Sequence, residues 1–125
     1  MLLVTDASTE ARGMYSDTPL HGAARRGHTG AAELLLSKGA SIEAMEEGNY
    51  TPLHLAVQNG HIGLVELLLE KGCSIETMDK DNTPLHFAAK SGYTGIVELL
   101  LGKGASIEAM NKDHYTPMDL AVWSC

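Results

Sequence analysis

The 125-residue chain has the length of one ordinary domain, and its composition, with 44% apolar and 20% charged residues, is that of a globular protein. A formal net charge of −7 argues against nucleic-acid binding, which draws most of its non-specific affinity from basic side chains. No apolar run approaches the roughly 20 residues of a membrane helix, so membrane insertion is not expected, and the opening Met1–Val4 is too short for a signal peptide.

Residues 1–17 look irregular until they are compared with the residues 33 positions further on. Leu2-Leu3 then matches Leu35-Leu36, and Ala7-Ser8 matches Ala40-Ser41. We therefore expect this segment to hold the end of a second helix and an extended arm, without the first helix of that unit.

A four-residue signature then recurs along the chain. TPLH begins at residues 18, 51 and 83, and TPMD begins at 116, so the starts lie 33, 32 and 33 residues apart. A fixed spacing of this size indicates a stacked repeat. The chain is predicted to be one domain with full units at 18–50, 51–82 and 83–115 and partial units at 1–17 and 116–125.

The unit 51–82 carries the clearest pattern. Thr51 can cap a helix that begins at Pro52, and Gly60 lets the chain reverse. A second helix is predicted from about His61, with leucines at helical spacing, until Gly72 ends it. The remaining residues, Cys73 to Asn82, suit an extended arm and a tight turn.

Three departures from the repeat carry structural expectations. Unit 83–115 lacks one residue just before its signature, so the preceding turn should be tighter and should lack an equivalent of Tyr50 and Tyr115. Asn49 and Asn82 stand near the turn position where a left-handed backbone conformation is expected, and asparagine tolerates that conformation. Ser16 and His114, at the matching positions of the other units, tolerate it less well. Gly22 replaces the Leu55 type, which predicts that the first full unit is the weakest.

The signature TPLHxA, a following Gly-His, and LLLxxGA together resemble the ankyrin-repeat family. Three copies of ELLL (33–36, 66–69, 98–101) and three of SIE (41–43, 74–76, 106–108) keep the same register, and the match covers almost the whole chain. The resemblance implies an all-α solenoid of antiparallel helix pairs joined by β-hairpin-like turns. It also implies a non-catalytic module that binds a protein partner on a concave surface.

In such a stack the turn tips and the exposed ends of the first helices line the concave side, and here the chain stops repeating itself. Tyr, Trp and Arg are the residue types that dominate interface energetics. The predicted partner-binding residues are Tyr15, Asp17, Arg25, Arg26, Glu47, Tyr50, Gln58, Lys80, Asp81, Lys90, Lys112, Asp113, Tyr115 and Trp123. The alternative for each is an unconstrained solvent face.

No catalytic, cofactor or metal site is predicted. His21, His54 and His86 recur at one point of the signature, where the resemblance implies a ring bonded to the Thr and to the turn backbone. Residues demanded by stacking in every unit are poor evidence for one active centre. Cys73 matches Ala40 and Ala105 and is read as a small buried side chain, so a disulfide with Cys125 is not expected.

Two further features remain open from the sequence. Glu43, Glu76 and Glu108, with Glu10, form an acidic column that is read as a solvated face neutralised by Lys38, Lys71 and Lys103, or as a docking strip for a basic partner. Leu120 and Val122 lie in a broken unit, so the chain is expected either to belong to a longer ankyrin protein or to self-associate weakly through its uncapped ends. A structural spacer is the alternative function, and the expected compartment is the cytoplasm or nucleus.

Overall fold

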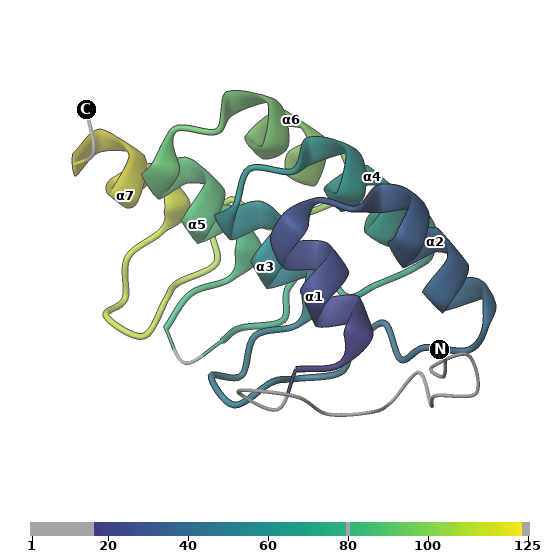
Figure 1. Ribbon diagram of the computed structural model, residues 1–125. Helices are drawn as coiled ribbons and strands as arrows, with labels where there is room; N and C mark the ends of the chain where they lie inside the picture. Colours follow the sequence, from purple (N-terminus) through teal and green to yellow (C-terminus); the bar gives the residue numbers. More distant parts are fainter. Residues whose placement is uncertain (1–16, 80, 124–125) are drawn as a thin grey trace.

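The computed structural model describes residues 17–79 and 81–123, and within them it contains seven α-helices and no strand (Figure 1). The helices are α1 (Pro19–Arg26), α2 (Thr29–Ser37), α3 (Pro52–Gln58), α4 (Ile62–Glu70), α5 (Pro84–Ser91), α6 (Thr94–Gly102) and α7 (Pro117–Trp123). The first helices α1, α3, α5 and α7 form one row, and α2, α4 and α6 form a second row behind it. This arrangement confirms the predicted all-α solenoid.

Each first helix begins as the sequence predicts. Thr18, Thr51 and Thr83 have extended backbones as N-caps, and each hydroxyl accepts a hydrogen bond from the backbone N–H three residues on. The proline that follows supplies no N–H where none could be satisfied. Left-handed glycines such as Gly27 (φ 73°) and Gly60 (φ 73°) then turn the chain towards the second helix.

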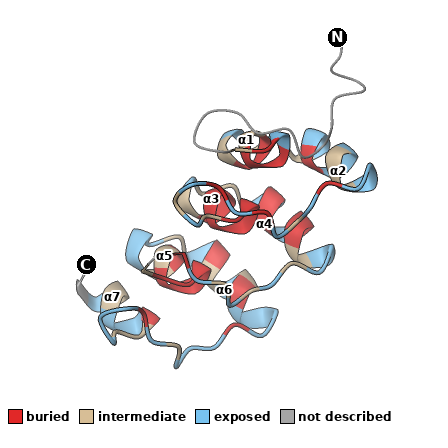
Figure 2. Ribbon diagram, turned by 90° about the horizontal axis from the view of Figure 1, so that it is seen from below, coloured by how far each residue is buried: buried red, intermediate tan, exposed pale blue. Residues whose placement is uncertain are grey.

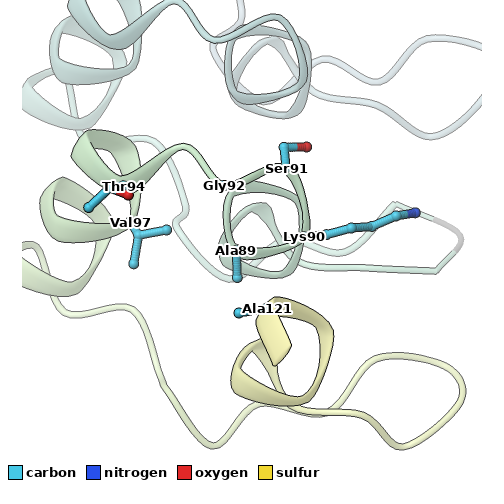
Figure 3. Close-up of a pocket in the computed structure, with 7 residues that line it drawn as sticks. All are labelled: Ala89, Lys90, Ser91, Gly92, Thr94, Val97 and Ala121. Carbon is cyan, nitrogen blue, oxygen red and sulfur yellow. The ribbon is translucent and has the colours of Figure 1, made fainter. Parts of the chain in front are cut away.

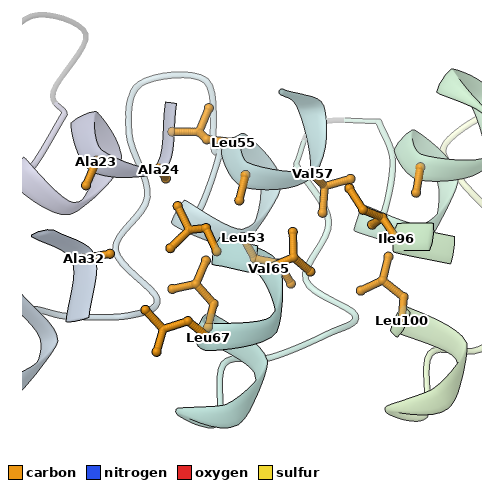
Figure 4. Packing of buried hydrophobic residues seen from close by; sticks show 14 of the residues in the cluster. Ala23, Ala24, Ala32, Leu53, Leu55, Val57, Val65, Leu67, Ile96 and Leu100 are labelled. Carbon is orange, nitrogen blue, oxygen red and sulfur yellow. The ribbon is translucent and has the colours of Figure 1, made fainter. Parts of the chain in front are cut away.

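The core lies between the two helix rows and runs continuously through the layers (Figures 2 and 4). Leu53, Leu64 and Leu68 are at most 1% exposed because their layer has helices on both sides. Leu34, at the first layer of the described part, is 60% exposed, although it matches Leu67 at 9%. A leucine of this motif is therefore buried only where a neighbouring layer covers it.

Hydrogen bonds also join one layer to the next. The ring of His61 donates from Nε2 to the carbonyl of Arg25 at 3.1 Å, and the Tyr93 hydroxyl donates to the carbonyl of Gln58 at 3.4 Å. His61 and Tyr93 stand at matching positions of successive units. Each donates a hydrogen bond to a carbonyl at the C-terminal end of the first helix in the preceding layer.

The acidic column has a structural role that neither sequence-based reading anticipated. The Glu43 carboxylate accepts the backbone N–H of Ser74, and that of Glu76 accepts the backbone N–H of Ser106, both at 2.5 Å. Lys38, Lys71 and Lys103 are exposed and take no part in the ion pairs found among the described residues. Glu43 and Glu76 therefore bond to the backbone of the next arm, and partial neutralisation by these lysines stays a prediction.

The turn after α4 is shorter than the others, as predicted, but a different residue is missing. The backbone N–H of Glu46 bonds to the carbonyl of Tyr50, and that of Asp79 bonds to the carbonyl of Asn82. Asn82 therefore occupies the position of Tyr50. The left-handed position, filled by Asn49 (φ 67°) and His114 (φ 69°), is the one deleted, so the prediction of left-handed geometry for Asn82 is wrong.

Replacing Gly22 by Ala is expected to raise the free energy of unfolding by up to about 1 kcal/mol, because Gly22 lies inside α1 and alanine has the higher helix propensity. No described atom lies within 4 Å of the added Cβ. Urea unfolding followed by far-UV circular dichroism measures the change.

Gly27→Ala is the matched control within the same layer and should destabilise the fold. Its Cβ would lie 2.6 Å from the His61 ring, and its φ is left-handed. Equal effects of the two substitutions would contradict the different roles assigned to these glycines.

Candidate functional site

A polar depression lies between the last two turns and the ends of α5 and α7. Its volume is about 230 Å³, and it brings together five of the predicted partner-binding residues. Its lining consists of Asp81, Asn82, Lys90, Asn111, Lys112, Asp113, Tyr115 and Leu120. The turns and first helices therefore share one surface here.

The two turns that border the depression are bonded to each other. Lys112 Nζ lies 3.0 Å from Asp81 Oδ1, and the backbone N–H of Lys112 donates to the Asp81 carbonyl at 3.0 Å. Behind this exposed ion pair, Asn111 Nδ2 donates to Asn82 Oδ1 at 2.9 Å in a buried contact. The Asp81 carboxylate raises the pKa of Lys112, so the lysine stays charged. The rim of the depression is consequently held in place before any partner arrives.

A second cluster lies at the other end of the same surface. The Arg25 guanidinium bonds to Asp17 through Nε at 2.9 Å and through an Nη at 3.2 Å, and it reaches Glu46 at 3.0 Å. The bond to Asp17 is the main cause of the raised pKa of Arg25. Arg25 therefore connects α1 to the following turn, and a partner would have to share it with these two carboxylates.

Glu46 belongs to a set of turn-stabilising positions that the sequence analysis did not identify. Its side chain is buried and accepts the backbone N–H groups of Gly48 and Tyr50. Asp79 and Asn111 hold the matching positions and bind their own turns in the same way. In the sequence, this set can be recognised because the first position of each of these turns holds a residue whose side-chain oxygen can accept a hydrogen bond.

The other candidates lie apart from the two clusters. Tyr50 is half-buried against the core, with its ring edge-on to His54 at a centroid distance of 6.1 Å, so it supports the fold as well as the surface. Arg26 and Glu47 are exposed, and Gln58 is half-buried near the end of α3. Tyr15 and Lys80 lie outside the described residues, as does the side chain of Trp123.

The three signature histidines are buried and fully engaged. In His54, Nδ1 accepts the backbone N–H of Thr51 at 3.0 Å, so the proton is on Nε2, which donates to the Thr77 carbonyl at 2.7 Å. His21 and His86 make the same pattern with their own threonines and turns. Each ring therefore ties a first helix to the arm or the turn of its own unit.

The described residues hold no group of three or more His, Cys, Asp or Glu side chains suited to a metal ion. Burial, with a smaller effect of Glu43, raises the pKa of the Cys73 thiol to about 12, which makes it a poor nucleophile. The described structure thus offers no evident catalytic group at this position.

A shallow depression of about 350 Å³ lies beside the polar one, where α7 meets the end of α5 and the start of α6 (Figure 3). Ala89, Val97 and Ala121 contribute to it and also to an adjoining apolar hollow of about 180 Å³. Met118 and Val122 on α7 are 61% and 63% exposed. Apolar surface is therefore accessible at this end of the stack.

Comparison with known families gives two matches along the chain. A model described as ankyrin repeats (three copies) matches residues 1–79, and a model of one ankyrin repeat matches residues 80–112. The chain matches no curated protein significantly. Across the part of the chain described by the structure, no helix is both long and apolar enough to cross a membrane.

Lowering the pH from 7 to 5.5 is expected to reduce the melting temperature. Burial lowers the pKa of His21 and His54 in the folded chain below the ordinary value of 6.5. As the pH falls through about 6.5, the unfolded chain therefore binds more protons than the folded chain, and the free energy of unfolding decreases.

His54→Gln provides the control for this prediction. The variant should be less stable at pH 7 but should lose less further stability on acidification, because one titrating group is gone. A melting temperature that does not change between pH 7 and 5.5 in the unaltered chain would refute the assignment.

Proposed function

Because the chain belongs to the ankyrin-repeat family, whose members are generally protein–protein interaction modules, we propose that it binds a protein partner along the surface formed by its turns and first helices. The observation that carries this proposal is the polar depression, in which Asp81, Lys90, Lys112, Asp113 and Tyr115 converge from two turns and a helix. The family is typically non-catalytic, which agrees with the structural engagement of the histidines.

The depression suits recognition because it combines fixed and adaptable groups. The Asp81–Lys112 pair and the Asn82–Asn111 bond set the shape of the rim, whereas Lys90 and Asp113 are exposed and can pair with charges on a partner. Preformed geometry lowers the entropy cost of binding. The Arg25–Asp17–Glu46 cluster would supply a second charged contact on the same surface.

The repeat boundaries and compartment belong to the same proposal. The helix pairs α1–α2, α3–α4 and α5–α6 support units 18–50, 51–82 and 83–115 in one domain, and α7 supports a partial unit at 116–125. Apart from Asp17, the partial unit proposed at 1–17, with Ser16, lies outside the described residues. The free thiol of Cys73 is consistent with the cytoplasm or nucleus. The alternative function is a spacer within a larger scaffold, in which the same surface would bind nothing.

A charge exchange on the concave side tests the binding surface. Proteins captured from a lysate by the unaltered chain are identified, and the purified partner is then titrated against Lys90→Glu/Asp113→Lys. The two changes leave the net charge unchanged and involve exposed side chains, so we expect an affinity loss of at least roughly tenfold with little change in melting temperature.

The matched control is Glu66→Lys/Lys71→Glu at exposed positions of α4 and its C-cap, in the other helix row. It should leave affinity within about twofold. Equal losses in both variants would reject the concave surface, and failure to capture any protein would favour the spacer.

We also propose weak self-association through the C-terminal end, because exposed apolar side chains gather there on α6 and α7. Met118→Lys/Val122→Lys should remove any concentration-dependent increase in mass measured by sedimentation equilibrium. An unaltered increase in the variant would place the contact elsewhere.

A further inference from the structure

Three exposed methionines form a row across the arms of the stack, and the sequence reasoning missed them. Met45, Met78 and Met110 occupy the same position in successive units and are 44%, 37% and 57% exposed. Residues 41–47 alternate between outward and inward positions, so Ser41, Glu43, Met45 and Glu47 share the outer face of the arm. We name Met45, Met78 and Met110 the methionine row.

The row differs from the scattered apolar side chains that any surface carries. The whole chain contains only six methionines, and three of them stand at one register position. The residue after each methionine, Glu46, Asp79 or Asn111, is buried and bonds to the turn backbone. The methionines themselves are exposed, and flexible thioether side chains adapt well to apolar ligands.

An acidic row runs beside the methionine row. Glu43, Glu76 and Glu108 each precede a methionine by two residues and are exposed. The bonds from Ser74 and Ser106 hold the first two carboxylates through Oε2, and a carboxylate retains further acceptor positions. The combined surface is therefore apolar along one line and negative along the parallel line.

We propose, on the basis of the protein-binding function above, that the methionine row and the adjoining acidic row bind a basic amphipathic α-helix of the partner. The charge on this surface favours Lys or Arg next to the apolar stripe of the ligand. This deepens the proposed function by assigning the class of segment that is recognised.

The spacing of the layers favours a helix over an extended segment. Packed helices lie about 8–10 Å apart, which sets the approximate separation of successive methionines. Residues i and i+7 of a helix lie on one face about 10.5 Å apart. An extended segment repeats one face every 6.6 Å or so, and residues three apart point to opposite faces, so it cannot match all three methionines.

A defined peptide tests the proposal on the full chain. The probe is a helical peptide of about 18 residues with leucines along one face and lysines flanking them. Binding is measured by fluorescence anisotropy, and the methyl groups of ¹³C-labelled methionine are followed by NMR. We expect the signals of Met45, Met78 and Met110 to shift, and Met45→Gln/Met78→Gln/Met110→Gln to weaken binding at least roughly tenfold.

Three comparisons separate this proposal from simpler outcomes. The control Leu34→Gln/Ile62→Gln/Leu101→Gln removes as many exposed apolar side chains from α2, α4 and α6 and should leave affinity within about twofold. A peptide with glutamate in place of lysine, and one of the same composition interrupted by prolines, should each bind at least tenfold more weakly. Equal effects of the two triple variants, or equal binding of the three peptides, would overturn the proposal.

The natural partner distinguishes this inference from the proposed function. If Lys90→Glu/Asp113→Lys abolishes capture and the methionine variant does not, the concave surface stands and the helix-binding row is rejected. If neither variant affects capture, both proposals fail.

Discussion

The buried contact between each signature threonine and histidine is the interaction on which the rest of the structure depends. The threonine hydroxyl caps the helix, the histidine Nδ1 accepts the threonine N–H, and Nε2 reaches a carbonyl of the following turn. The threonine–histidine pair thus caps the start of a helix and also holds the arm and turn of the same unit in place. Because Nδ1 accepts a hydrogen bond only when the ring is neutral, protonation of His21 or His54 would break the bond from the threonine N–H. The surface proposed for recognition includes the turns held by this arrangement.

Around that contact, two sets of polar side chains bond to different parts of the backbone. Glu46, Asp79 and Asn111 satisfy the backbone of their own turns, and Glu43 and Glu76 satisfy the backbone of the next arm. Every buried side-chain nitrogen and oxygen atom of the described residues has a partner. Lys90, Asp113 and the methionine row are exposed, and in the proposals above these groups carry specificity. This division explains why a surface built on a regular stack can differ from unit to unit.

Much of the fold followed from the sequence, because repetition lets each motif be read several times. The caps at Thr18, Thr51 and Thr83, the reversals at Gly27 and Gly60, and the buried leucines all agree with local rules of helix formation.

The candidate surface was less predictable from the sequence than the fold. Arg25 looked like an exposed anchor, yet its pairing with Glu46 depends on a turn 21 residues away that spacing alone cannot place. The role of Asn82 was misjudged because an alignment by residue count cannot show which residue of a turn has been deleted, whereas the backbone bond from Asp79 can. The methionine row was overlooked because exposure, which distinguishes it from core, is not visible in a repeated pattern.

The bonds from side chains that link separate parts of the stack reach between 21 and 36 residues along the chain, which is about the length of one unit. Among the described residues, none of these bonds joins distant layers of the stack, so loop-closure entropy stays small and structure can begin in any layer and spread to its neighbours. The same locality means that a whole 33-residue module can be inserted or removed in register without breaking the pattern of bonds elsewhere. The length of the proposed binding face is for this reason adjustable by recombination of units, while its chemistry changes by point substitution.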